Sequence, residues 1–145
     1  MTSAVVNSDD VNKNPVAIES PGSDANRAEQ GSTGKVTLDD KYVQATGRVF
    51  MNANQALVRL PLDQARRDKA AGLNSACYIS GYRGSPLGVY DSALWGAQKL
   101  LDRHNIVFQP GLNEELAISA IRGTQELKWF GESKYDGVFG LWYGK

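Results

Sequence analysis

Two adjacent glutamates begin a predicted helix in the stretch QPGLNEELAISAIRG, residues 109–123. Asn113 is suited to cap this helix, which the apolar spacing extends from Glu114 to about Phe130. At 100° per residue, Glu114 shares its stripe with small and apolar side chains: Ala117, Ala120, Ile121 and Leu127. Glu115 instead aligns with polar side chains, so we expect Glu114 to face inward. An acid in the first turn also complements the helix dipole, and that simpler role stays open.

The glutamate belongs to the pattern E-x2-A-x2-A-x2-G, formed by Glu114, Ala117, Ala120 and Gly123. Small side chains on the stripe of the glutamate let a neighbouring chain or a flat ring approach closely. Burial would raise the pKa of the Glu114 carboxyl group, which suits proton exchange near neutral pH. The pattern therefore allows acid/base chemistry at Glu114.

A second candidate site is the loop GYRGSPLG, residues 81–88, whose three glycines and one proline disfavour regular structure. The loop fits neither G-x-G-x-x-G nor G-x4-G-K-[ST], so we do not expect it to hold nucleotide phosphates. Gly81 and Gly84 would let the backbone come close to a ligand. Arg83 could pair with a carboxylate or lie in solvent as an ordinary loop arginine.

Strands and helices alternate in the part of the chain that must position these residues. Residues 52–73 are predicted as two short helical pieces interrupted at Leu60-Pro61, because proline lacks a donor and restrains its predecessor. Short apolar runs in 75–80, 105–111 and 135–145 predict strands, and helical spacing predicts a helix over 89–104. This order favours an α/β fold with a parallel three-stranded sheet and crossover helices. Such a sheet needs cover on both faces, so we expect part of a larger protein.

The composition separates the first part of the chain from the rest. The 145 residues carry 16 basic and 16 acidic side chains, a balance that recommends neither nucleic acid nor membrane as a partner. Residues 1–40 hold seven acids against three bases, and the first aromatic residue is Tyr42. We therefore predict a disordered acidic, polar tail over 1–36. No apolar run suggests a secretory signal or a membrane span, so the expected location is the cytoplasm.

The chain has one cysteine and one histidine, which limits its metal chemistry. Cys77 alone can form neither an internal disulfide nor a multi-cysteine metal site, and its run SACYIS suggests a small buried hydrophobe. His104 falls where a helix should end, as a surface cation rather than a ligand. No metal site is predicted in this chain. The tryptophans are predicted as core or interface aromatics.

Three segments carry a resemblance to a known family. CYISGYRGSPLGVYD, FQPGLNEELAISAIRGTQ and DGVFGLWYGK resemble the amino-terminal region of fused indolepyruvate ferredoxin oxidoreductases, in the order and spacing of that family. The resemblance covers Val43 to Lys145, and the glutamate helix is similar to that of the pyrimidine-binding domain of thiamine diphosphate enzymes. It implies that residues 37–145 are an incomplete domain of the thiamine diphosphate-binding fold.

The resemblance also implies roles for particular residues. Glu114 would be the catalytic glutamate, which hydrogen-bonds N1′ of the aminopyrimidine of the cofactor. Ala117 and Gly144 would also contact the cofactor. The substrate would be contacted by Arg83, Gly84 and Ser85, with Ser85 at the position of a hydroxyl that meets the substrate carboxylate. Arg83 departs from the proline of many relatives, which leaves its role less defined.

The implied reaction is oxidative decarboxylation of a 2-oxo acid, an arylpyruvate such as indolepyruvate, with coenzyme A taking the acyl group and ferredoxin the electrons. The diphosphate with its Mg²⁺ and the 4Fe-4S clusters would be held outside this chain, so we expect the chain alone to be inactive and the complete enzyme to be oligomeric. Two alternatives stay open. One is a non-catalytic α/β binding or assembly module that retains the fold; the other is a truncated product.

Overall fold

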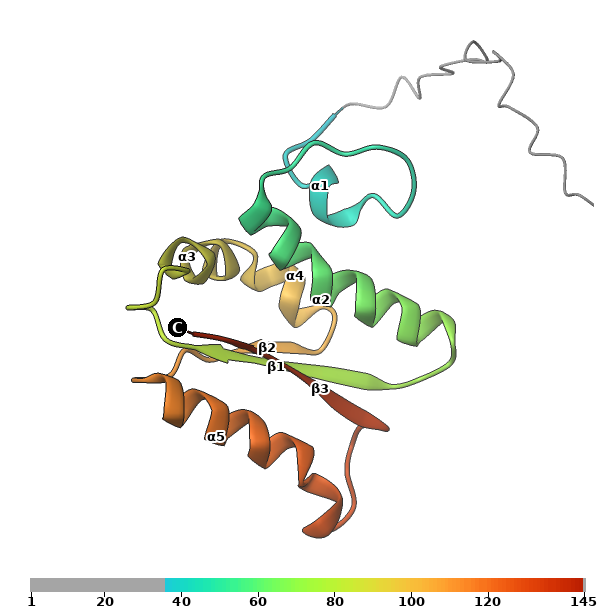
Figure 1. Ribbon diagram of the computed structural model, residues 1–145. Helices are drawn as coiled ribbons and strands as arrows, with labels where there is room; N and C mark the ends of the chain where they lie inside the picture. The colour runs from blue at the N-terminus through green and yellow to red at the C-terminus, as the bar shows by residue number, and fades with distance from the viewer. Residues whose placement is uncertain (1–35, 145) are drawn as a thin grey trace, which may run out of the picture. The chain divides into compact units, whose positions relative to one another are not determined.

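The computed structural model describes residues 36–144, which contain nine helical and strand elements (Figure 1). The predicted tail over 1–36 lies outside the described residues except for Val36. The elements in chain order are α1 (Asp40–Val43), α2 (Ala53–Ala70), β1 (Ser75–Gly81), α3 (Gly88–Gly96), α4 (Gln98–Asp102), β2 (Ile106–Phe108), α5 (Glu114–Gln125), the 3-10 helix η1 (Leu127–Trp129) and β3 (Gly137–Tyr143).

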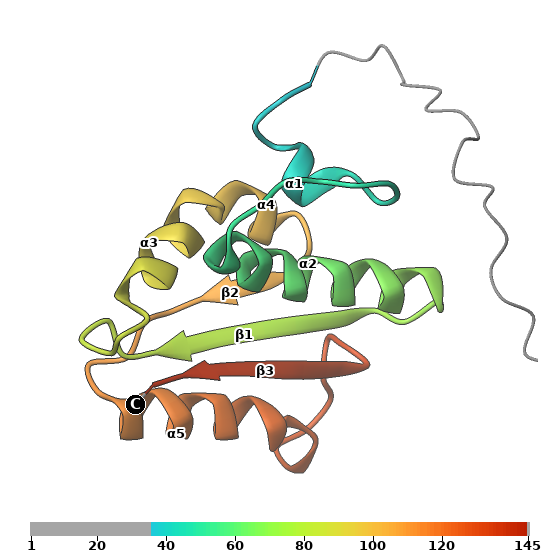
Figure 2. The same ribbon diagram turned by 45° about the horizontal axis from the view of Figure 1, so that its top comes forward.

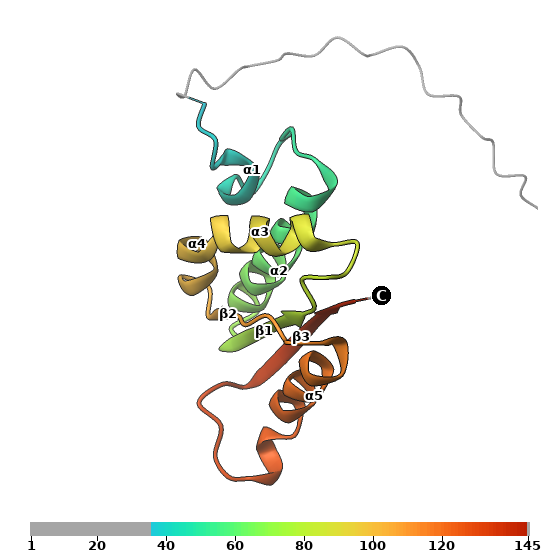
Figure 3. The same cartoon turned by 90° about the vertical axis from the view of Figure 1, so that its left-hand side faces the viewer.

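The three strands form one parallel sheet in the order β2-β1-β3. Cys77 of the central strand β1 is in register with Ile106 of β2 and with Phe139 of β3. Helices α2, α3 and α4 cover one face and α5 covers the other (Figures 1 and 2). Figure 3 shows the sheet between these two layers of helices. The predicted α/β fold with a parallel three-stranded sheet is therefore confirmed.

The main core lies between the sheet and the layer formed by α2, α3 and α4. Leu62 of α2, Leu94 of α3, Leu101 of α4 and Ile79 of β1 are all fully buried there. Cys77 is buried in the same cluster, as its sequence context predicts, and burial raises the pKa of its thiol to about 12. This buried core fixes the strands, and therefore the positions of their ends.

The predicted break at Leu60-Pro61 is wrong, because α2 runs without interruption from Ala53 to Ala70. Proline in a helix leaves the carbonyl four residues earlier without its usual donor. That carbonyl belongs to Leu57, and the hydroxyl of Tyr90 donates to it over 3.3 Å. A tertiary hydrogen bond thus replaces the lost helical one. Gly72, with φ of 79°, follows the helix as predicted.

Two other helix boundaries also differ from the prediction. The helix expected over 89–104 is two helices, α3 and α4, separated at Ala97, whose amide is shared by the carbonyls of Ala93 and Leu94. Gly96 weakens the helix at this point, and the tighter turn keeps both halves facing the core. Helix α5 ends at Gln125 rather than near Phe130. The residues beyond Gln125 have left the sheet, as the 80% exposure of Phe130 shows.

Candidate functional site

The carboxyl-terminal ends of all three strands meet at one edge of the sheet. The segment after β2 is held to β1 by the Gly111 amide, which donates to the Gly81 carbonyl over 2.8 Å. The Tyr82 amide in turn donates to the carbonyl of Tyr143 at the end of β3 over 3.4 Å. Ligands of open parallel α/β sheets bind at this edge. The predicted site residues at 83–85, 114 and 144 lie in the segments at these strand ends.

Glu114 occupies the first position of α5. The side chain of Asn113 accepts a hydrogen bond from the Leu116 amide over 2.8 Å, which confirms the predicted cap. Glu114 is half-buried whereas Glu115 is exposed, so of the two acids Glu114 faces inward, as the helical spacing predicts. The start of α5 therefore brings one carboxylate to the edge of the sheet, beside the end of β3.

The end of β3 passes close over this glutamate. The Trp142 indole Nε1 donates to the Glu114 carbonyl over 3.4 Å. A Cβ atom on Gly144 would lie 2.9 Å from Cγ of Glu114 and 2.4 Å from the Trp142 ring, so a larger residue here would force these side chains to shift. A shallow hollow of about 270 Å³ is lined by Glu114, Glu115, Ile118 and Trp142. The structure thus brings Glu114 and Gly144 together beside an apolar wall.

The small-residue stripe of α5 leaves the buried face after its first turn. Ala117 is fully buried, and a Cβ atom on Gly111 would lie 2.8 Å from its own Cβ. Ala120 and Gly123 are exposed instead. Steps of three residues fall about 60° short of a full turn, so they drift away from the face that Ala117 and Ile121 share. The expected inward position of Ala120 is wrong; Ala117 keeps α5 close to the segment after β2.

The loop after β1 is ordered by its own contacts. Ser85 is buried, and its hydroxyl accepts a hydrogen bond from the Leu87 amide over 3.2 Å. A Cβ atom on Gly84 would lie 2.5 Å from the Tyr82 ring, and one on Gly81 would lie 2.4 Å from the Tyr143 carbonyl oxygen. The close neighbours of these glycines in the structure are therefore tyrosines of this chain.

A buried carboxylate, Asp91, joins this loop to the end of β3. Oδ2 of Asp91 accepts hydrogen bonds from Nε and Nη2 of Arg83, at 3.0 and 2.9 Å. Oδ1 accepts the Tyr143 hydroxyl at 3.0 Å. Asp91 is fully buried, while the Arg83 side chain is 68% exposed. Burial, then the hydrogen bond to Asp91, raises the pKa of the Tyr143 hydroxyl. Asp91 thus ties two of the site segments into one unit.

Sequence reasoning missed Asp91, although a signal for it was present. Asp91 stands three residues before Leu94, which places an acid on the apolar stripe of its helix. The same spacing argument singled out Glu114. Arg83 is neither a free loop arginine nor wholly available to a ligand, because Asp91 occupies two of its nitrogens. Its Nη1 group has no hydrogen-bond partner among residues 36–144.

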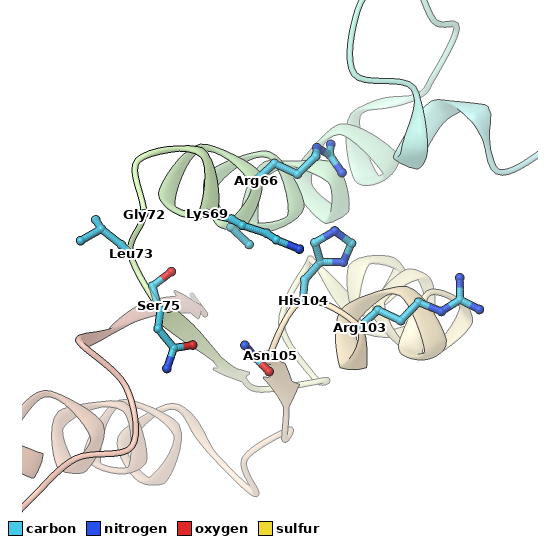
Figure 4. Close-up of a pocket in the computed structure, with 10 residues that line it drawn as sticks. Arg66, Lys69, Gly72, Leu73, Ser75, Arg103, His104 and Asn105 are labelled. Atoms are coloured by element: carbon cyan, nitrogen blue, oxygen red, sulfur yellow. The ribbon is translucent and has the colours of Figure 1, made fainter.

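A larger hollow, of about 550 Å³, lies at the opposite, amino-terminal edge of the sheet (Figure 4). We call it the basic hollow, since its lining includes Arg66, Lys69, Arg103 and His104, together with the polar Asn74 and Asn105. The described part of the chain contains no group of three His, Cys, Asp or Glu side chains arranged to hold a metal ion. The ring nitrogen Nδ1 of His104 lies 2.9 Å from the Leu100 carbonyl oxygen at the end of α4, in agreement with its predicted place.

Comparison with known proteins does not identify the chain. No protein-family model, curated protein or solved structure matches it. Among residues 36–144, no helix combines the length and apolar character that crossing a bilayer requires. The assignment to thiamine diphosphate enzymes remains a prediction from the sequence.

Proposed function

We propose that this chain is the amino-terminal part of a thiamine diphosphate dependent 2-oxoacid:ferredoxin oxidoreductase located in the cytoplasm and acting on an arylpyruvate such as indolepyruvate. The observation that carries the proposal is the half-buried Glu114 beside Gly144 at the carboxyl-terminal edge. Bound thiamine diphosphate supplies the carbon nucleophile and electron sink for decarboxylation of a 2-oxo acid. Coenzyme A, ferredoxin, Mg²⁺ and the 4Fe-4S clusters meet other parts of the oligomeric enzyme.

The residues present fit the pyrimidine half of this cofactor. The hollow joins the two acids at the start of α5, Glu114 and Glu115, to an apolar wall of Ile118 and Trp142. Of the two acids, Glu114 is the one that faces inward. Gly144 leaves room beside Glu114, because the Cβ atom of a larger residue would lie 2.9 Å from Cγ of Glu114 and force that side chain to shift. Ala117 contributes by holding α5 against Gly111. Glu114 would hydrogen-bond a ring nitrogen of the aminopyrimidine.

The loop after β1 would meet the substrate. Gly84 and Ser85 lie in this loop. The Ser85 hydroxyl oxygen accepts a hydrogen bond from the Leu87 amide. The hydroxyl keeps its own hydrogen to donate to a carboxylate. Arg83 offers Nη1, with its orientation held by Asp91. Two donors on one ordered loop suit recognition of the carboxylate of a 2-oxo acid.

The test is Glu114→Gln in the assembled enzyme, with exchange of the C2 proton of bound cofactor followed by NMR. General acid/base catalysis contributes about 10²- to 10⁴-fold, and we expect exchange to slow by a factor in that range. The matched control is Glu132→Gln, an exposed acid outside the hollow, which should exchange at the wild-type rate. Normal exchange in Glu114→Gln would overturn the role of Glu114.

A second candidate is a non-catalytic α/β binding or assembly module. Large apolar side chains before and after α5 favour it, since Leu112, Trp129 and Phe130 are each at least 79% exposed. This candidate predicts that the assembled protein retains no thiamine diphosphate. Binding of the cofactor, measured by calorimetry on the wild-type assembly, separates the two.

A further inference from the structure

Two cations in the basic hollow have no partner of their own. Among the described residues, neither the side chain of Lys69 nor that of Arg103 forms a hydrogen bond or an ion pair. Arg66 differs, because it is bound by Asp63 and by the Tyr42 carbonyl. No acidic side chain contributes to the lining of the hollow. The hollow therefore presents positive charge that the chain itself leaves largely free.

Two helices end beside the hollow, and their dipoles account for only part of this charge. A helix carries about half a negative charge at its carboxyl terminus, so α2 and the shorter α4 offset at most about one cation. Three carboxylates contact residues of the lining: Asp63 binds Arg66, Asp68 accepts the Ser75 hydroxyl and Asp136 accepts the Asn74 amide. None of the three pairs with the side chain of Lys69 or Arg103. The positive charge of Arg103 and Lys69 together therefore exceeds the negative charge of the two helix termini.

The turn between α4 and β2 presents further polar groups in fixed orientations. Nδ1 of His104 faces the Leu100 carbonyl and so carries the hydrogen, which leaves Nε2 for another partner. Figure 4 shows the Lys69 ammonium pointing toward this ring across the hollow. Asn105 has φ of 54° and is the only described non-glycine residue in the left-handed region. Its backbone is anchored by the Cys77 amide, which donates to its carbonyl over 3.0 Å.

These groups suit an anion with several oxygens. Lys69 and Arg103 are rich in donors and have no acceptor, and phosphate offers more acceptor oxygens than a carboxylate does. A volume of about 550 Å³ exceeds the needs of an inorganic ion and falls in the range of small-molecule sites. Ala65 and Leu73 supply an apolar part of the lining for an organic group.

We propose that the basic hollow binds a small phosphate ester, with the phosphate between Lys69 and the turn of residues 103–105. This inference does not rest on the proposed function, because it uses none of the residues at the carboxyl-terminal edge.

The experiment is a titration of the ¹⁵N-labelled 145-residue chain with inorganic phosphate and with glycerol 1-phosphate at constant ionic strength. Acetate serves as the carboxylate comparison, and the amide signals of Gly72 and Asn105 report binding. We expect glycerol 1-phosphate to bind more tightly than inorganic phosphate, and both more tightly than acetate. In Lys69→Gln/Arg103→Gln the affinity should fall about 25-fold, or about fivefold for each exposed charge removed.

The matched control is Arg122→Gln/Lys128→Gln, which removes the same charge from exposed positions on and after α5. It should bind like the wild type. Equal weakening in both double variants, equal binding of acetate, or no saturable shift in the wild type would each overturn the proposal. Tighter binding of a polyglutamate peptide at the same amides would also overturn it, in favour of an acidic protein partner. Vesicles containing phosphatidylglycerol distinguish a lipid headgroup from a free phosphate ester.

Discussion

The two edges of the sheet use charge in opposite ways. At the carboxyl-terminal edge, Asp91 is fully buried and both of its oxygens are occupied, by Arg83 and Tyr143. At the amino-terminal edge, Lys69 and Arg103 are exposed around an open hollow. A buried and fully paired charge fixes the positions of its neighbours, because separating them would leave polar groups unsatisfied. An exposed and unpaired charge fixes little and remains available to a ligand.

Cys77 lies in β1, between the two edges. The burial of its thiol gives the largest expected effect, on the rate of chemical labelling. With a thiol pKa of about 12, only about one molecule in 10⁴ would carry the thiolate at pH 8, compared with a substantial fraction in the unfolded chain. Labelling of the native protein by a disulfide reagent should be more than about 10³-fold slower than labelling of the denatured chain. Rapid labelling under native conditions would contradict the packing of β1.

The raised pKa of the Cys77 thiol also predicts how stability changes with pH. The folded state keeps the thiol protonated, whereas the unfolded chain loses this proton above its ordinary value of 9.0. The contribution to stability is therefore fully present below pH 9.0 and is lost as the pH rises toward about 12. Cys77→Ala should remove this part of the decline, as measured by urea unfolding across that range.

Asp91→Ala should have the next largest effect. The substitution leaves the buried Tyr143 hydroxyl without its acceptor, while the exposed Arg83 can turn to solvent, so we expect a loss of about 2 kcal/mol in the free energy of unfolding. Asp102→Ala, at an exposed position near the other edge, should change it by less than about 0.5 kcal/mol. Equal losses in urea unfolding would remove the contrast between the edges.

Tyr90→Phe tests a second buried hydroxyl near the carboxyl-terminal edge, where the Tyr90 ring meets that of Tyr143 at 5.2 Å. It should reduce stability by about 1 kcal/mol, because the Leu57 carbonyl loses its donor. In a Pro61→Ala background the new amide can supply that donor, so the reduction should shrink. A double-mutant cycle in urea measures this coupling; a coupling of zero would refute the compensation for Pro61.

Lys69→Gln/Arg103→Gln should have the smallest effect on folding. Because neither cation has a partner among residues 36–144, removing both should change the free energy of unfolding by less than about 0.5 kcal/mol. Thermal unfolding with and without glycerol 1-phosphate provides the measurement. A loss comparable to that of Asp91→Ala would mean that the basic hollow is a structural element rather than a free surface.

Local signals were sufficient for much of this protein. The alternation of apolar runs with helical spacing predicted the parallel α/β sheet, Asn113 predicted the start of α5, and the stripe of Glu114 predicted which acid faces inward. These features depend on backbone geometry and on neighbours within one or two turns, which the sequence contains directly.

Only the tertiary structure decided features that depend on partners far along the chain. Helix α2 continues through Pro61 because Tyr90, 33 residues from Leu57, supplies a donor. Asp91 is a paired buried charge because Arg83 and Tyr143 meet it from two other segments, the latter 52 residues away. The four basic side chains of the hollow come from the ends of α2 and α4, which are adjacent only because β1 and β2 pair. Spacing along the sequence determines which face a side chain takes, whereas packing determines what it meets there.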